Sequence, residues 1–142
     1  MNPIGFLYAV GAAITWGLVY TIDQKILTNI SPLTLLFIDS LITALIMMPF
    51  FFLDKKPIMN LVHSGKVNLL LIFISLLLAV VANFLIYSGI KTIGASMASI
   101  FEISYPLFVV LFSFLFFRTS VNTAFLIGAL LIFVGSIIIL KF

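Results

Sequence analysis

Five long apolar stretches, separated by short polar breaks, constrain this chain more than any other feature of its sequence. Each is about 20 residues long, the length that an α-helix needs to cross the hydrocarbon core of a bilayer. Because unpaired backbone groups are not tolerated in lipid, each stretch is expected to be helical even where Val, Ile and Phe would favour a strand in water. We therefore predict an all-α integral membrane protein, a bundle of five transmembrane helices over residues 4–22, 33–53, 67–90, 95–117 and 121–140.

Composition excludes a soluble fold. Hydrophobic residues make up 64% of the chain and charged residues 8%, whereas an average soluble domain is roughly 25% charged. The chain has no Cys, so a disulfide framework, a thiolate nucleophile and a Cys metal site are excluded. Its net charge of +3 comes from scattered Lys and Arg rather than a basic run, which favours lipid headgroup contacts and not nucleic-acid binding.

The N-terminus and the loops bear on topology. Met1-Asn2-Pro3 lacks the basic segment of a signal peptide, so we expect the first apolar stretch to remain in a multi-pass protein of the plasma membrane. The longest loop, residues 54–66, concentrates Lys on one side, which favours a cytoplasmic N-terminus. The bias is small, because Lys25, Lys91 and Lys141 lie on the other side. Insertion in both orientations with antiparallel pairing is therefore the alternative.

Polar side chains within the apolar stretches indicate the candidate site. Counting along the 33–53 and 95–117 helices at 1.5 Å per residue places Asp39 and Glu102 ~10 Å below the same membrane face. Asn83 in the 67–90 helix belongs to the same layer. Acidic groups at such depths normally face the bundle interior or water, because exposure to lipid is costly. We predict a chamber at this level in which Glu102 binds an ion or a proton. Capping or snorkelling at the interface is the alternative for Asp39.

Aromatic residues and a proline surround this layer. Trp16, Tyr20, Tyr87 and Tyr105 are candidates to line a substrate pocket, although interface anchoring is the more common use of Trp and Tyr. Pro106 lies four residues after Glu102 and removes one backbone donor. We predict a kink there that acts as a gate.

Several segments together resemble one EamA repeat of the drug/metabolite transporter superfamily. They are Ala13-Ile14-Thr15-Trp16-Gly17, the run from Ile86 to Ser96, Tyr105-Pro106-Leu107-Phe108 with Leu115-Phe116-Phe117, and the run from Gly128 to Gly135. The resemblance covers essentially the whole chain and is nearest to the five-helix, single-repeat members. It departs at Arg118, where family repeats often carry Glu, and at Asp39, near which they often carry a basic residue.

The resemblance implies a transporter that needs a second chain. Larger relatives contain two such repeats in opposite orientations and work by rocking one against the other around a central site. A lone repeat therefore implies a dimer, most simply with another copy inserted the other way, or a heterodimer with a second single-repeat protein. Small multidrug resistance proteins are similar in this respect, but their essential Glu lies in the first helix, which has no acidic residue here.

The last predicted helix offers a dimer interface. Ala124, Gly128 and Gly135 fall on one of its faces, and small residues let helix backbones approach closely in lipid. The spacing of the glycines also resembles the glycine heptad on the last helix of small multidrug resistance proteins. The alternative is that these residues pack against other helices of the same chain.

Other chemistry is not indicated. His63 is the only histidine and is interpreted as a headgroup contact, and no catalytic triad, phosphate loop or metal-ligand spacing is present in the sequence. We expect that the protein is not an enzyme and that it binds no cofactor or metal. The prediction is a secondary transporter that exports a small metabolite or amphipathic compound; a lipid-carrier flippase and a non-transporting subunit of a heteromeric complex remain as alternatives.

Overall fold

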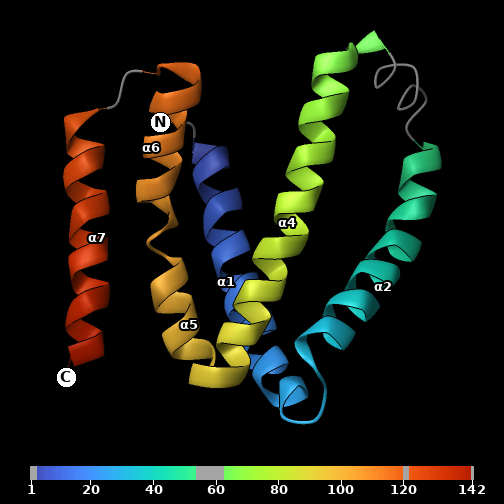
Figure 1. The fold of residues 1–142 in the computed structure, drawn as a ribbon, viewed down its shortest axis with the longest axis horizontal. Coiled ribbons are helices and arrows are strands. Elements are labelled where there is room, and N and C mark those ends of the chain that lie inside the picture. The colour runs from blue at the N-terminus through green and yellow to red at the C-terminus, as the bar shows by residue number, and fades with distance from the viewer. Residues whose placement is uncertain (1–2, 54–62, 120–121, 142) are drawn as a thin grey trace. The chain divides into compact units, whose positions relative to one another are not determined.

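The computed structural model describes residues 3–53, 63–119 and 122–141, and these form helices joined by short turns (Figure 1). Four spans are long and apolar enough to cross a membrane, α5 and α6 together forming one of them, and α7 is a shorter apolar helix. This confirms the predicted fold class. The helices are α1 (Pro3–Leu27), α2 (Pro32–Leu53), α4 (Lys66–Ile93), α5 (Ala95–Glu102), α6 (Tyr105–Phe117) and α7 (Thr123–Lys141).

Helix α1 is longer than its apolar stretch. The sequence placed its end at Ile22, but the helix continues to Leu27 and contains the polar residues that follow Ile22. Polar residues end an apolar pattern, but they do not break a helix. A helix is ended by a proline, a glycine or a competing cap. Here the stop is Ser31-Pro32: the Ser31 hydroxyl accepts a hydrogen bond from the Thr34 amide at 3.1 Å and caps α2.

Helix α4 also exceeds its prediction and leads directly into α5. It runs through Lys91 and Thr92, which the sequence assigned to a turn, and ends at Ile93. Gly94 alone separates it from α5, with a φ of 83° that a residue with a Cβ adopts only under strain. Glycine adopts this conformation without steric cost, so one helix can follow the other without a loop.

The span over residues 95–117, for which the sequence predicted a kink at Pro106, is interrupted just before that residue. Helix α5 ends at Glu102 and α6 begins at Tyr105, so that Ile103 and Ser104 form a turn. Pro106 occupies the first turn of α6, where its missing N–H matters least. In a continuous helix that N–H would have bonded to the Glu102 carbonyl, so the proline accounts for a break at this position.

Helix α7 starts slightly later than expected. Asn122 caps it by accepting a hydrogen bond from the Ala124 amide at 2.9 Å, which sets its first residue at Thr123. The predicted start at residue 121 lies outside the described residues, as do residues 54–62 of the longest loop. Arg118 ends α6 in a left-handed conformation with φ 49°.

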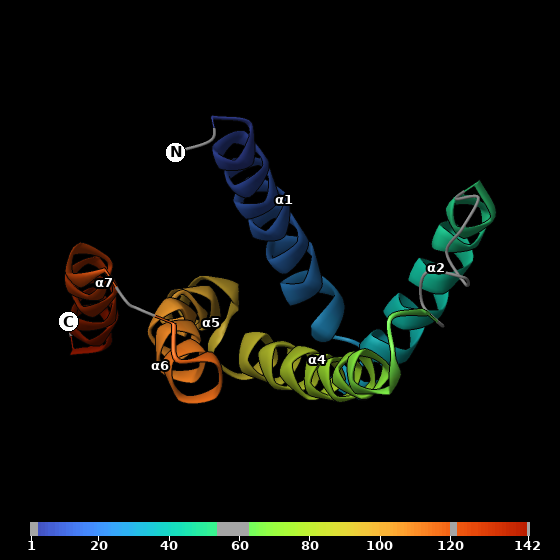
Figure 2. The same cartoon turned by 90° about the horizontal axis from the view of Figure 1, so that it is seen from above.

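The chain divides into two compact units: Met1–Ile22 with Ile93–Phe142, and Asp23–Thr92. In the first, α6 and α7 lie side by side in both views (Figures 1 and 2). Small buried residues allow α5 and α7 to approach closely; they are Ala98 on α5 and Ala129 and Ser136 on α7. The Ser136 hydroxyl lies 3.0 Å from the Ile100 carbonyl, which ties α7 to α5.

The second unit contains the end of α1, helix α2 and helix α4 (Figures 1 and 2). Leu27, Leu35, Leu36 and Ile90 are buried in this unit. The Lys91 ammonium donates a hydrogen bond to the Ile30 carbonyl at 2.8 Å, which fastens the end of α4 to the turn between α1 and α2.

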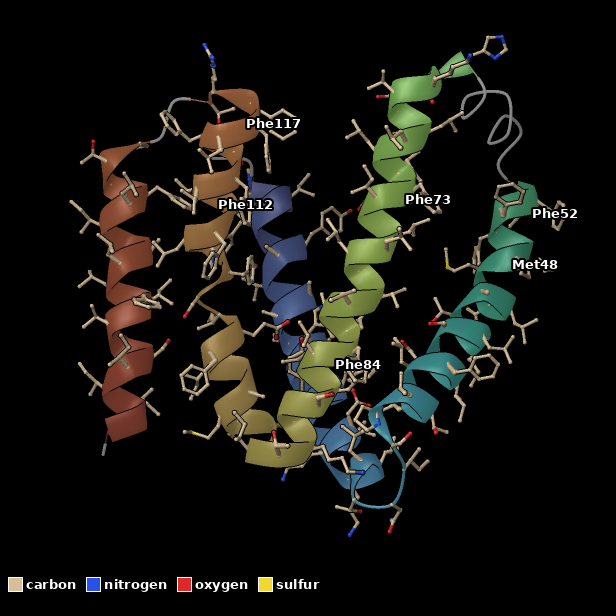
Figure 3. All side chains as sticks on the ribbon, in the orientation of Figure 1. Met48, Phe52, Phe73, Phe84, Phe112 and Phe117 are labelled. Atoms are coloured by element: carbon tan, nitrogen blue, oxygen red, sulfur yellow. The ribbon has the colours of Figure 1, made fainter. Side chains whose placement is uncertain are left out.

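Most large apolar side chains project outward along the helices (Figure 3). Phe52 on α2 and Phe117 on α6 are 75% and 72% exposed. In water such a surface would drive aggregation, whereas in a bilayer lipid chains or a second protein chain cover it.

Candidate functional site

The first polar pair joins α1 to α5. The Tyr20 hydroxyl donates a hydrogen bond to Glu102 Oε2 at 2.6 Å, although the two residues are 82 positions apart in the sequence. Tyr20 is 9% exposed, and the Trp16 ring lies one turn earlier with its centroid 5.6 Å from that of Tyr20. The structure therefore brings together three of the residues that the sequence proposed for the site.

The position of Glu102 gives this pair its chemical character. Glu102 is the last residue of α5 and lies directly before the turn that interrupts the span. Its side chain is exposed, so the carboxyl group is open to a ligand while Tyr20 fixes one of its oxygens. The carbonyl ends of a helix carry partial negative charge, which adds to that of a carboxylate. This arrangement favours a proton or a positively charged group over an anion.

The second polar pair lies in the unit formed by residues 23–92. The hydroxyl of Tyr87 on α4 donates a hydrogen bond to Oδ2 of Asp39 on α2 at 3.3 Å. Tyr87 is almost fully buried and Asp39 is exposed. Asn83 lies one helical turn before Tyr87 on α4 and is half-buried. Among the described residues no hydrogen bond joins Asn83 to Asp39, so a shared role for the two stays a prediction.

Asp23 is the residue that sequence reasoning missed. It was assigned to the polar break after the first helix, but it lies within α1 and is 7% exposed. Its Oδ2 atom is buried without a hydrogen-bond partner. The signal that would have found it is the return of apolar residues at Ile26 and Leu27, which continues the helical pattern beyond Asp23.

The remaining predicted site residues lie near the face between α6 and α7. Tyr105 and Pro106 line an open groove of about 430 Å³ together with Gly128 and Ala129. Tyr105 is 60% exposed there. The sequence placed Tyr105 in the substrate pocket, and that role is not tested by its position in this groove.

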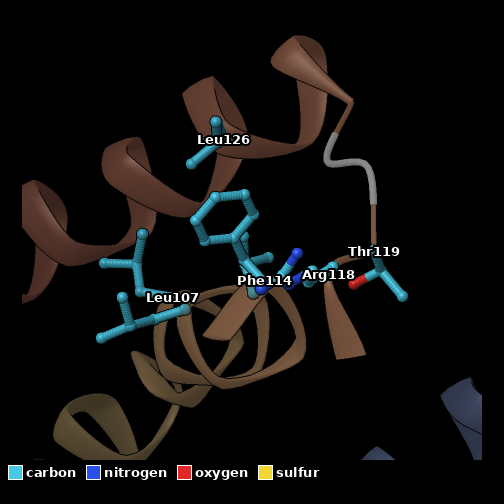
Figure 4. Close-up of a pocket in the computed structure, with 7 residues that line it drawn as sticks. Leu107, Phe114, Arg118, Thr119 and Leu126 are labelled. Carbon is cyan, nitrogen blue, oxygen red and sulfur yellow. The ribbon is translucent and has the colours of Figure 1, made fainter. Parts of the chain in front are cut away.

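A second groove of about 490 Å³ lies farther along the same two helices (Figure 4). Its walls are apolar side chains of both helices, and Arg118 and Thr119 at the end of α6 are its polar contribution. Figure 4 shows Phe114 and Leu126 facing across it. Such a groove suits an acyl chain or an apolar side chain better than a polar solute. Its lining residues are Leu107, Val110, Leu111, Phe114, Arg118, Thr119 and Leu126.

Gly128 and Gly135 on α7 are uncontacted on the side where a Cβ would point. A Cβ built on either glycine meets no atom within 4 Å. The buried face of α7 is the neighbouring one, formed by Ala129 and Ser136. The described helices therefore bury the residues next to the glycines, no atom fills the space at either glycine, and Gly128 also borders the open groove beside α6.

Apolar spans with an interrupted helix and carboxyl groups within the spans define a multi-pass membrane protein of the transporter type. The model of the EamA-like transporter family matches residues 3–141, and the chain belongs to this family. This confirms the resemblance identified in the sequence. No curated protein and no solved structure matches the chain.

Proposed function

We propose that this protein is a secondary transporter that exports a small metabolite or amphipathic compound from the cell across the plasma membrane, with Glu102 as the residue that couples export to proton or cation binding. The observation that carries the proposal is the 2.6 Å hydrogen bond between Tyr20 and Glu102 at the interruption between α5 and α6. Family membership supports transport in general, and the chemistry of this pair supports the finer assignment.

The cost of placing Glu102 in an apolar span argues for a function. An acid at the centre of a membrane helix costs about 2.5–3.5 kcal/mol on insertion scales and somewhat less at the depth expected for Glu102, and such residues usually mark ion or substrate pathways. Interrupted helices recur at transporter sites because the freed backbone and side chains can bind a ligand. Glu102 combines both features. A proton and a positively charged compound that compete for this carboxyl group would give exchange across the membrane.

We further propose that the working unit is a dimer with its interface on α7. A single EamA repeat supplies half of the two-repeat arrangement found in larger family members. A second copy inserted the other way would complete it, and a second single-repeat protein would serve equally. The open faces of Gly128 and Gly135 support an interface there, because a partner helix could approach the backbone closely. Ala124 lies one helical turn before Gly128 and is also exposed.

The test uses proteoliposomes with an imposed pH gradient and a panel of amphipathic cations, beginning with tetraphenylphosphonium. The wild type should drive export that depends on the gradient, and Glu102→Gln should abolish it without changing expression or helicity. Glu102→Asp is the matched control, because it keeps the acid while shortening its reach to Tyr20; we expect partial flux. Gradient-dependent flux that persists in Glu102→Gln at the wild-type rate would refute the assignment of Glu102.

A further inference from the structure

In the described part of the unit formed by residues 23–92, the carboxyl groups of Asp23 and Asp39 have no ion-pair partner. Asp23 and Asp39 are close enough to interact electrostatically, and Tyr87 interacts with both. Asp23 is 7% exposed, and its Oδ2 atom is buried without a hydrogen-bond partner. Among the residues that the structure describes, no Lys, Arg or His forms an ion pair with either carboxyl group.

Two basic side chains on these helices, those of Lys91 and Lys25, do not pair with Asp23. The Lys91 ammonium donates to the Ile30 carbonyl at 2.8 Å. Lys25 is exposed and lies two residues after Asp23 on α1, a spacing at which side chains point to different sides of a helix. Neither therefore neutralises Asp23.

The two carboxyl groups differ in how their charge is accommodated. Asp39 is exposed and accepts a hydrogen bond from Tyr87 at 3.3 Å, so solvent and a hydroxyl can stabilise its charge. The buried Oδ2 atom of Asp23 has neither solvent nor a hydroxyl group to stabilise a negative charge. Burying an ionised carboxyl group without a partner is among the most unfavourable arrangements in a protein, and binding one positive charge removes the cost. Asp23, Asp39 and Tyr87 together therefore lack one positive charge, and it is Asp23 that needs it.

We propose that Asp23, Asp39 and Tyr87 form a binding site for one small monovalent cation, either a sodium ion or a proton. Asp23, Asp39 and Tyr87 offer carboxyl and hydroxyl oxygens, the hard ligands that alkali cations and protons share. The burial of Asp23 Oδ2 and of Tyr87 favours a compact cation over an organic ammonium group. The site belongs to the unit that does not contain Glu102.

A cation at this site would be the coupling ion or a second ion of the transport cycle. That role rests on the function proposed above, whereas cation binding itself does not. Binding can be measured without flux, so the failure of one proposal leaves the other standing.

The first arm of the test measures sodium binding by thermal stability. The full chain in lipid nanodiscs is melted in NaCl and in N-methyl-D-glucamine chloride at equal ionic strength and pH. A cation that binds the folded state raises the melting temperature in a saturable manner. We expect Asp23→Asn to abolish this response and Tyr87→Phe to weaken the apparent affinity about three- to tenfold, the usual effect of losing one hydrogen bond. Tyr8→Phe, on the same helix as Asp23, is the control, because Tyr8 is 77% exposed, and it should respond as the wild type does.

The second arm detects a proton at the same site. If a proton fills the site, sodium has little effect on the wild type. Its infrared difference spectrum against Asp23→Asn should then show the C=O stretch of a protonated carboxyl group. If Asp23→Asn does not fold, Tyr87→Phe replaces it in both arms, because loss of the hydroxyl should shift the sodium midpoint or the pH at which the carboxyl band disappears. Equal melting temperatures in the two salts together with no such band would overturn the proposal. A sodium response that is lost in Glu102→Gln but kept in Asp23→Asn would overturn it as well.

Discussion

Replacing Tyr20 with Phe removes the hydroxyl that holds Glu102 and leaves the ring in place. Hydrogen bonds between side chains on membrane helices average about 0.6 kcal/mol and reach about 1.7 kcal/mol. The Tyr20 bond is 2.6 Å long and ends on a carboxyl oxygen, which places it in the upper part of that range. Glu102 is exposed, so its carboxyl group is not left buried and unsatisfied when the hydroxyl is lost, and the cost should stay below the top of that range. We expect a loss of about 1.4 kcal/mol in the free energy of unfolding, roughly a tenfold change in the ratio of folded to unfolded protein.

The molecule provides its own probe for this measurement. Trp16 is the only tryptophan, and its ring centroid is 5.6 Å from that of Tyr20. Its fluorescence should report separation of α1 from α5 as SDS is titrated into mixed micelles. Tyr8→Phe on the same helix is the matched control, since Tyr8 is 77% exposed and its hydroxyl should contribute almost nothing.

A double-mutant cycle isolates the bond from other effects of Tyr20. Combining Tyr20→Phe with Glu102→Ala should give a coupling energy of about 1 kcal/mol, because each single change already removes the interaction. A cost for Tyr20→Phe no larger than that for Tyr8→Phe, or a coupling energy below about 0.3 kcal/mol, would show that the pair is not formed.

Two further predictions concern α7. Gly128→Leu combined with Gly135→Leu should convert a detergent-solubilised dimer into a folded monomer, as measured by sedimentation or crosslinking. Gly11→Leu, at another uncontacted glycine, is the control and should leave the dimer intact. A folded double variant that still dimerises would exclude this interface. Ser136→Leu should lower the free energy of unfolding by about 1–3 kcal/mol, because Ser136 is 4% exposed and has no room for a larger side chain beside the Ile100 carbonyl. An SDS unfolding curve that matches that of the wild type would contradict the packing of α7 on α5.

The helical spans were predictable because the bilayer imposes a single length rule on apolar sequence. The predicted starts of the 33–53 and 67–90 helices fall within one residue of the structure. The errors occur where this rule gives no information. Nothing in apolar length reveals that α1 continues past Ile22, because Asp23, Gln24 and Lys25 are compatible with a helix. The interruption before Tyr105 is equally invisible to hydropathy, and Pro106 was its only local sign.

The sequence predicted a depth for each acidic residue but could not predict which side chain each one contacts. Counting residues from the ends of a helix gives the depth of Glu102 or Asp39, but the direction in which each helix face turns depends on packing between distant segments. Tyr20 and Tyr87 were therefore identified as site residues without their carboxyl partners. Asp23 escaped because its importance lies in burial, which depth counting does not supply.

The outward orientation of the apolar side chains separates two properties that are coupled in soluble proteins. None of the residues in the most apolar stretch of α4 is buried by the rest of the chain. Each helix is thus stabilised by its own backbone hydrogen bonds and by lipid, before any neighbour is present. Variants at Tyr20, Asp23 or Gly128 should therefore insert with normal circular dichroism and pass cellular quality control as helices, while losing the hydrogen bond, the proposed cation site or the proposed dimer interface to which each residue belongs. A defective protein of this kind would accumulate in the membrane at normal levels.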